Sequence, residues 1–368
     1  MSGRNESGYH VALVGASTLK GKEIKEVLQE RQFPLSRLEM LDADEVGGQL
    51  TEFDDEPAII QPVSRDSFEG IDLAFFASSP AFTEKHWQLA EANDAQIIDL
   101  SYFLESNPKA ILRSPMIEHL WTNDEDDSHA QLRDSRILVA AHPAAIATVA
   151  ILLNLSVHFD VKRMAITIYE PVSEHGKAGV DELHQQTVNF LSFQKVPRQV
   201  FHSQVAFNLQ AGCGDDRRPA LREVEQRIHR HVEIVLGGRA RRPALRVLQA
   251  PIFYGYALSC FVELKDSIPT AAIEEALDRE PLAICQDPEA QPTVVDVAGS
   301  DHIVLGSVKS DPACDTGYWI WGVLDNLRLT AHNAVQIAEE LVHAHEKGPG
   351  KLDERPNRES ELRTERSE

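Results

Sequence analysis

A short glycine-containing segment near the N-terminus has the residue types and spacing of a phosphate-binding loop. Gly15 and Gly21 bracket the run GASTLKG, which follows an apolar strand pattern and leads into a helix pattern. In such a loop, backbone N–H groups at a helix N-terminus bind a dinucleotide pyrophosphate. Ser17, Thr18 and Leu19 would then contact the cofactor. Thr18 stands where a GxxGxxG loop has its middle glycine, so its side chain narrows the space for phosphate.

An acidic residue at the end of the next predicted strand indicates which dinucleotide fits. Asp42 directly follows an apolar run, and Asp44 comes two positions later. A carboxylate at this place accepts hydrogen bonds from a ribose hydroxyl and repels a 2′-phosphate. The sequence therefore favours NAD over NADP. Two alternatives stay open. In the first, the loop and Asp42 bind a nucleotide. In the second, this part of the chain has a Rossmann-type fold that binds neither NAD nor NADP, and Asp42 lies in a solvated turn.

The turn His142-Pro143-Ala144-Ala145 joins a short apolar strand pattern to an apolar helix pattern, and it contains no nucleophile. Acyl transfer needs a thiolate or hydroxyl that attacks the acyl carbon, and an alanine methyl group supplies neither. His142 is an imidazole beside this position. We interpret it as a structural histidine.

Strand and helix patterns alternate along the first 142 residues. Such alternation predicts a parallel, doubly wound sheet. The predicted strands cover residues 9–15, 37–41, 72–77, 96–100 and 137–140, and the predicted helices cover 20–31 and 81–93.

The pattern changes after Pro143. Long alternating strands in 163–171 and 244–263, with few crossover helices, are typical of an α+β domain with a mostly antiparallel sheet. A helix over 223–236 is closed by two glycines, and a last helix over 324–345 is predicted to pack back on the first domain. The fold class is therefore α/β: an N-terminal Rossmann-type parallel sheet plus a C-terminal α+β domain. The predicted boundaries are a disordered N-terminus 1–9, a first domain 10–142 completed by helix 324–345, a second domain 143–323, and a disordered charged tail 346–368.

The composition is that of a soluble protein with two domains. The 368 residues are 42% hydrophobic, which is ordinary for a globular chain. No apolar window is long enough for a membrane helix, and the N-terminus lacks a signal-peptide core. The net charge of −22 repels nucleic acid and anionic membranes. Four widely spaced cysteines predict reduced thiols in a cytoplasmic protein and no metal site.

Segments spread over nearly the whole chain resemble the aspartate-semialdehyde dehydrogenase family. They are VALVGA at 11–16, ERQFP at 30–34, VSEHGKA at 172–178, APIFYG at 250–255, and Asp325–Asn326 with NAVQIA at 333–338. The resemblance implies a homodimer in amino-acid biosynthesis, with an N-terminal NAD(P)-binding domain, to which Asn326 contributes, and a C-terminal catalytic and dimerisation domain. Family members reductively dephosphorylate an aspartyl phosphate through a cysteine thioester. That chemistry needs a thiolate, an acid/base histidine, and arginines that bind the substrate carboxylate and phosphate.

At the positions that match the family's catalytic residues, this sequence has residues that cannot perform the same chemistry. The nucleophilic cysteine falls at Ala145, and the asparagine beside it falls at Ala144. The glutamine that orients the acyl group falls at Glu170, which adds a negative charge beside an anionic substrate. The carboxylate-binding arginine falls at Gln249, whose amide cannot form a bidentate ion pair. The acid/base histidine falls at Tyr256, whose phenol titrates far above neutral pH.

Three other matches bear on the same site. The phosphate-binding arginine, in the loop after Asp99, falls at Glu105, whereas Arg227 keeps the basic character of a family lysine. His175 and Lys177 remain in a matching segment, where we interpret both as solvated.

Two cysteines are candidates to replace the missing nucleophile. Cys260 follows Tyr256 by four residues and so points to the same strand face. We interpret Cys260 as a small core residue. Cys314, in a predicted loop, is the weaker candidate.

Three functions fit this pattern. The favoured one is a pseudoenzyme that keeps the homodimer and the nucleotide cleft without cysteine-dependent catalysis. The second is an active NAD(P)-dependent oxidoreductase with changed chemistry, in which Glu170 or Tyr256 is the acid/base and hydride transfer is direct. The third is a regulatory subunit that forms a mixed dimer with an active paralogue.

Overall fold

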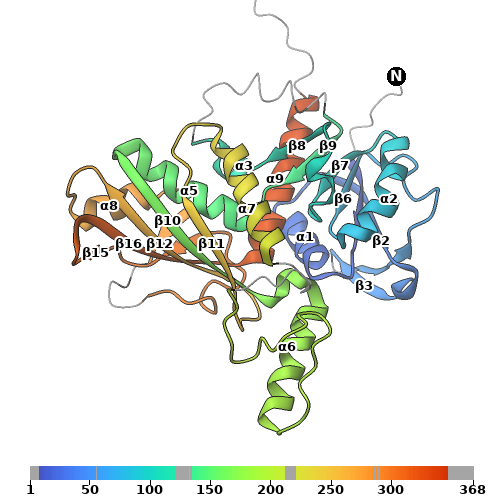
Figure 1. Ribbon diagram of the computed structural model, residues 1–368. Coiled ribbons are helices and arrows are strands. Elements are labelled where there is room, and N and C mark those ends of the chain that lie inside the picture. Colours follow the sequence, from blue (N-terminus) through green and yellow to red (C-terminus); the bar gives the residue numbers. More distant parts are fainter. Residues whose placement is uncertain are drawn as a thin grey trace, which may run out of the picture.

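The computed structural model describes residues 8–54, 56–120, 132, 135–211, 221–285, 287 and 291–346. Two large sheets stand on either side of the long helix α9 (Asn326–Glu346), as Figure 1 shows. We call the parts built on them the first and second modules. The segments predicted to be disordered, 1–9 and 346–368, fall outside the described residues except at their inner ends, where Tyr9 begins β1 and Glu346 ends α9.

The first sheet is parallel throughout, in the order β5-β2-β1-β6-β7-β9-β8. Its central strands are buried on both faces, because α2 packs on one face and α1 with α9 on the other. The predicted doubly wound sheet is thereby confirmed. The strand order reverses between β1 and β6, so this fold's ligand crevice lies beyond their carboxyl ends. The elements are β1 (Tyr9–Val14), α1 (Leu19–Glu30), β2 (Leu35–Asp42), β3 (Leu50–Phe53), β4 (Glu56–Ile59), β5 (Gln61–Pro62), β6 (Leu73–Phe76), α2 (Pro80–Ala92), β7 (Gln96–Asp99), β8 (Ala110–Arg113), α3 (Pro115–Glu118) and β9 (Ile137–Ala140).

The second sheet is mixed, in the order β11-β10-β12-β16-β14-β13, with β15 beside β16. Two pairings, β10–β11 and β13–β14, are parallel, and the others are antiparallel. Helices α5, α7 and α8 cover one face and form a large apolar core with it. The predicted α+β domain is confirmed. Its elements are α5 (Pro143–His158), β10 (Val161–Glu170), α6 (Gly176–Leu191), α7 (Leu221–Leu236), β11 (Ala244–Gln249), β12 (Tyr256–Leu264), α8 (Thr270–Leu277), β13 (Leu282–Ile284), β14 (Ile303–Leu305), β15 (Lys309–Asp311) and β16 (Cys314–Leu324).

Helix α6 is the largest element that the sequence pattern did not predict. Glycines in its first turn lower its helix propensity, yet Gly179 is required there, because a Cβ would lie 2.3 Å from the carbonyl oxygen of Val172. The helix projects away from both modules in Figure 1. Apolar side chains near its tip are exposed, up to 99% for Phe193. Among the described residues, no helix is long and apolar enough to span a bilayer.

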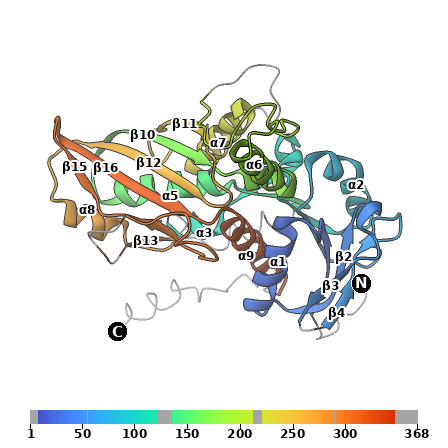
Figure 2. The ribbon, with the colours of Figure 1, turned by 90° about the horizontal axis from the view of Figure 1, so that it is seen from below.

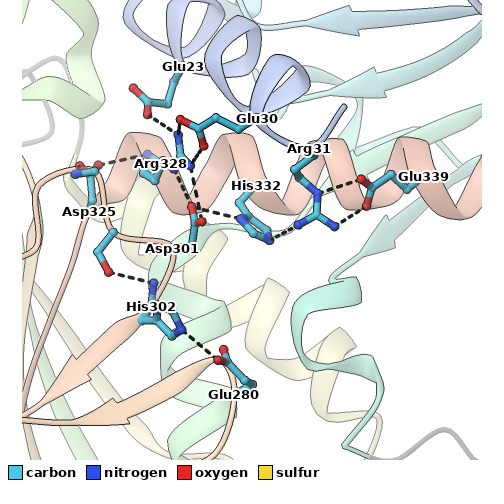
Figure 3. Close-up of polar contacts among 12 residues, drawn as sticks. Glu23, Glu30, Arg31, Glu280, Asp301, His302, Asp325, Arg328, His332 and Glu339 are labelled. Carbon is cyan, nitrogen blue, oxygen red and sulfur yellow. Dashed lines mark hydrogen bonds and ion pairs between the residues drawn. The ribbon is translucent and has the colours of Figure 1, made fainter. Parts of the chain in front are cut away.

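One arginine of α9 joins α9 to α1 and to a loop of the second module (Figure 3). The Arg328 side chain is only 7% exposed and contacts the carboxylates of Glu23 and Glu30 from α1. Its Nε lies 2.5 Å from Oδ1 of Asp301, in the loop before β14. His332, one turn further along α9, lies 3.1 Å from the same oxygen. One guanidinium is therefore the ion-pair partner of three carboxylates.

Replacing Glu23 by glutamine is expected to stabilise the protein above neutral pH. Burial, together with nearby Glu26 and Asp325, raises the pKa of Glu23 from 4.5 to about 7. A carboxyl whose pKa is higher in the folded state contributes stability below its unfolded pKa and loses that contribution as the pH rises through its folded pKa. With solvent screening allowed for, Glu23→Gln should gain about 1 kcal/mol at pH 8.

Thermal unfolding at about pH 5 and pH 8 checks this expectation. The gain should be much larger at the higher pH, since Glu23 is mostly protonated in the folded state at the lower one. Glu84→Gln, at an exposed position of α2, is the control and should change nothing. Equal gains at both pH values would contradict the expectation.

Candidate functional site

A cavity of about 690 Å³ lies where the carboxyl ends of β1, β6, β7 and β9 face the second module. Its volume is within the range of small-molecule and cofactor sites. The lining residues from the first module are Ser17–Lys20, Ala77–Pro80, Ser101, Tyr102 and His142; those from the second are Glu170, Ser173–Lys177, Val200, Glu223, Val224 and Arg227. In the described part of the chain, no cluster of histidine, cysteine and carboxylate side chains could hold a metal ion.

The predicted phosphate loop forms a tight turn at this cavity. Gly15 has a φ of 90°, and a Cβ on Gly21 would lie 2.1 Å from the Gly15 carbonyl oxygen. The Thr18 hydroxyl caps α1, because it accepts the Gly21 N–H at 2.9 Å and donates to the Gly15 carbonyl at 2.7 Å. Thr18 lines the cavity together with Ser17 and Leu19. Its hydroxyl is thus bonded within the loop.

Two further cofactor candidates hold loops in place behind the cavity wall. Asp42 is buried, and its Oδ2 accepts hydrogen bonds from the Ser17 N–H at 2.9 Å and hydroxyl at 2.6 Å. Its Oδ1 accepts the Ala43 N–H at 2.8 Å, so Asp42 lies beneath the loop rather than in a solvated turn. Asn326 is also buried and accepts the Ser173 hydroxyl at 3.2 Å. Their contact with a cofactor stays a prediction.

The turn at 142–145 places two buried methyl groups at the start of α5. The His142 Nδ1 caps the helix by accepting the Ala144 N–H at 3.2 Å. Ala144 and Ala145 are fully buried. No described cysteine lines the cavity. Cys260 lies in the second module's core, where burial raises the pKa of its thiol.

A hydrogen-bonded chain runs behind this turn from Glu105 to Tyr256. The His142 backbone N–H donates to His231 Nδ1 at 3.0 Å, and His231 Nε2 lies 3.0 Å from a Glu105 oxygen. At the other end, His142 Nε2 lies 3.4 Å from the Tyr256 hydroxyl. Burial, followed by the charge on His231, holds the pKa of His142 well below its usual value. Burial and nearby carboxylates raise the pKa of Tyr256 well above its usual value, so both groups are neutral.

Glu105 neutralises the basic side chains at this end of the cavity. Its oxygens lie 3.3 Å from Arg227 Nε and 3.2 Å from Arg230 Nη2, besides the contact with His231. Burial raises the pKa of Glu105, but the hydrogen bond from His231 and the two arginines outweigh it and lower the pKa. An anionic ligand in the cavity would compete with Glu105 for Arg227, which lines the cavity.

Tyr102 holds two cations at the cavity wall. The Arg227 guanidinium and the Lys20 ammonium lie 4.8 and 4.9 Å from the centre of its ring. Lys20 also donates to the Leu100 carbonyl at 3.2 Å and lies 4.0 Å from Glu174. The backbone of Tyr102 is left-handed, with φ 65°, which is uncommon for a bulky residue. Its buried hydroxyl has no partner among the described residues.

A second polar group, formed by Glu170, Gln249 and His175, lies on the opposite wall. His175 Nε2 is 3.2 Å from Gln249 Oε1 and 3.2 Å from Glu170 Oε1. The Gln249 amide donates to the carbonyls of Glu170 and Ala250 at 2.9 and 3.2 Å, which leaves its oxygen to accept from His175. Burial lowers the pKa of His175, but Glu170 and then Glu174 outweigh it and raise the pKa above its usual value.

The structure brings most of the predicted positions together. His142, Glu170 and Arg227 line the cavity, and Gln249 and Tyr256 contact lining residues from behind. The expectation that Lys177 is solvated is right, since its side chain is 75% exposed.

The same expectation for His175 is wrong, because its side chain is 13% exposed and paired with Glu170. Sequence reasoning also missed Lys20, Tyr102 and His231. The first two follow the ends of β1 and β7, where this fold carries ligand-binding residues, and that placement was an available signal.

Comparison with known proteins matches both modules. Residues 10–121 match the semialdehyde dehydrogenase NAD binding domain, and residues 152–329 match the semialdehyde dehydrogenase dimerisation domain. A USG-1 protein homologue from Pseudomonas aeruginosa is 31% identical over 340 residues, which cover 90% of this chain and 97% of the relative. An aspartate-semialdehyde dehydrogenase from Rickettsia bellii is 27% identical over 344 residues, covering 92% and 98%. The solved aspartate-semialdehyde dehydrogenase II from Vibrio cholerae, complexed with ASA, has a TM-score of 0.80 and 26% identity over 91% of this chain and 98% of that chain.

Fold, cavity and domain matches together define a protein of the semialdehyde dehydrogenase class, whose two modules match the NAD binding and dimerisation domains of that class. Within that class, the chain belongs to the aspartate-semialdehyde dehydrogenase family. The resemblance inferred from the sequence is confirmed.

Proposed function

We propose that this protein is a pseudoenzyme of its family, which keeps the two-domain scaffold and lacks cysteine-dependent reductive dephosphorylation. The observation that carries the proposal is the buried methyl group of Ala145 at the position expected for the nucleophile, in a cavity that no described cysteine lines. Without a thiolate, no thioester forms. An assay with aspartate semialdehyde, phosphate and NAD or NADP tests the proposal. Turnover in proportion to protein concentration would overturn it.

The contacts at the other vacated positions support the same conclusion. Both ends of the Gln249 amide are bonded within the protein, so a substrate carboxylate finds no donor there. Glu105 pairs with the arginines that could otherwise bind phosphate. Tyr256 is buried and contacts His142, which makes it a poor replacement for an acid/base histidine. These contacts favour the pseudoenzyme over an oxidoreductase that uses Tyr256.

We further propose that the phosphate loop still binds a dinucleotide and prefers NAD. The loop geometry supports binding, and the exposed carboxylate of Asp44 after β2 would repel a 2′-phosphate. Calorimetry should show NAD binding, with NADP at least about 10-fold weaker. Asp44→Arg should reduce this difference in affinity between NAD and NADP, whereas Glu84→Gln should not. Equal affinities for NAD and NADP, or no binding of either, would contradict the proposal.

We also propose a homodimer formed through the second module. Its match to the family's dimerisation domain supports this. The sheet face opposite α5, α7 and α8 carries large aromatic side chains, among them Tyr169, Trp319 and Trp321, and the tip of α6 exposes Phe193. A mixed dimer with an active paralogue would use the same surfaces, and co-purification of such a dehydrogenase from cells would favour it.

A further inference from the structure

We propose that His175 is the general base of a second, thiol-independent activity in this cavity, the hydrolysis of an uncharged ester by an activated water molecule. This goes beyond the loss of dehydrogenase chemistry and needs no nucleotide. Three features carry the proposal: the hydrogen bonds that orient the His175 imidazole, the hydrogen bonds and ion pairs that occupy nearby hydroxyls and cations, and the helix that begins directly after His175.

The His175 ring is fixed by three neighbours from different elements. Gln249 accepts from its Nε2 at 3.2 Å, and Glu170 lies 3.2 Å from the same nitrogen. The Phe201 ring packs edge-on, with centroids 5.1 Å apart. Nδ1 makes no hydrogen bond with any described residue, and His175 lines the cavity. A histidine whose Nε2–H is held by the protein presents the basic lone pair of Nδ1 to a bound water.

The charges that face His175 suit a base working near neutral pH. Glu170 from β10 and Glu174 from the adjoining 3₁₀ turn are its nearest carboxylates, and Lys20 from α1 lies behind Glu174 at 4.0 Å. They favour the protonated imidazole, so its pKa lies above 6.5. His142, in the same cavity, has its pKa lowered and its Nδ1 occupied by the Ala144 N–H. Two titratable groups whose pKa values are shifted in opposite directions are typical of an acid/base site.

Water is the nucleophile that we assign to this activity. Four serine and threonine hydroxyls on the cavity wall donate to fixed acceptors, burial raises the pKa of the Tyr102 phenol well above its usual value, and no described cysteine lines the cavity. The pairs are Ser17 with Asp42, Thr18 with the Gly15 carbonyl, Ser101 with Asp99, and Ser173 with Asn326. These hydroxyls are therefore poor nucleophiles, whereas a water beside Nδ1 would be free to attack.

The start of α6 supplies a place for the oxyanion. The helix begins at Gly176, directly after His175, and no side chain caps it. The Gly176 N–H already donates to the Ser173 carbonyl, so the donor that we assign to the oxyanion is the N–H of the next residue, Lys177. The first N–H groups of a helix carry partial positive charge, and Lys177 lines the cavity. Backbone donors of this kind stabilise the negative oxygen of a tetrahedral intermediate.

An uncharged substrate fits because the nearby cations are already paired. Arg227 lies against Glu105 and the Tyr102 ring, and the Lys177 ammonium contacts Asp181 at 2.6 Å. No unpaired cation of the described wall is left for a substrate carboxylate or phosphate.

The reaction proceeds in two steps. Nδ1 of His175 takes a proton from water as the water oxygen bonds to the carbonyl carbon, and the C=O electron pair moves onto the carbonyl oxygen. That pair then re-forms the C=O bond and the bond to the alkoxy oxygen breaks, after which the leaving alkoxide takes the proton from Nδ1. The products are a carboxylic acid and an alcohol, and His175 is regenerated.

Hydrolysis of 4-nitrophenyl acetate tests the assignment. We expect His175→Gln to lower kcat/KM by about 100-fold. His184→Gln, at an exposed position of the same helix, should have no effect. The wild-type rate should rise with pH through a midpoint above 6.5, since the neutral imidazole is the active form. Glu170→Gln should move that midpoint down, because it removes the negative charge beside the ring.

Equal rates for the wild type and His175→Gln would overturn the proposal. A wild-type midpoint below the usual histidine value would also overturn it, and that measurement needs no variant to fold. Either result leaves the pseudoenzyme proposal standing, because that proposal concerns turnover of aspartate semialdehyde, which is assayed separately.

Discussion

The wild-type protein should turn over aspartate semialdehyde with phosphate and NAD or NADP at least about 10⁴-fold more slowly than an active member of its family. The reason is the buried methyl group of Ala145, which cannot bond to an aldehyde or acyl carbon. Formation of reduced nicotinamide, followed by absorbance, is the measurement. The Vibrio cholerae enzyme, assayed under the same conditions, provides the reference rate.

The single variant Ala145→Cys separates the nucleophile from the rest of the site. It restores a thiol but leaves Glu170, the internally bonded Gln249 and the neutral pair of His142 and Tyr256. We therefore expect it to stay at least about 100-fold below the reference enzyme, because Tyr256 and Gln249 still replace the family's acid/base histidine and carboxylate-binding arginine. Full activity of Ala145→Cys would contradict the role given to those positions, and substantial wild-type turnover would contradict the pseudoenzyme.

The sequence predicts the two sheets well because the pattern of apolar residues along their strands matches the side chains that are buried in the structure. The buried parallel strands β1, β6 and β9 appear as short apolar runs, and β10 and β12 appear as alternating strands. Helix α6 could not be predicted in the same way. Its stability depends on tertiary contacts such as the buried Glu182 carboxylate, which accepts backbone N–H groups from the segment that returns along the helix.

Positions in the site could be predicted from the sequence, but their partners could not. Family resemblance located Tyr256 and Gln249, whereas the contacts of these residues with His142 and His175 join segments far apart in the chain. The solvated interpretation of His175 failed for this reason, since Gln249 of β11 helps to bury its ring. Asp42 is a similar case, because the hydrogen bonds that occupy it come from within the phosphate loop.

Replacing Arg328 by methionine is expected to destabilise the folded protein by about 3 kcal/mol. Methionine keeps the apolar stem and removes the guanidinium, so the change isolates the charge. Glu23, Glu30 and Asp301 would then face one another without a counter-ion at the junction of α1, α9 and the loop before β14 (Figure 3). Figure 2 shows α9 beside α1 in a second view. Breaking a mostly buried ion pair by removing one partner leaves uncompensated charge, which costs more than the pair contributes.

Urea-induced unfolding measures this loss, with Arg37→Met as the matched control. The Arg37 side chain is 67% exposed and pairs with Glu39 at 2.6 Å, so its replacement should change stability by less than about 1 kcal/mol. Adding Glu30→Gln to Arg328→Met should recover part of the loss, since one of the repelling charges is gone. If Arg328→Met unfolds at the same urea concentration as Arg37→Met, the carboxylates around Arg328 do not need it as a counter-ion. A loss that Glu30→Gln leaves unchanged would instead assign the effect to packing rather than to charge.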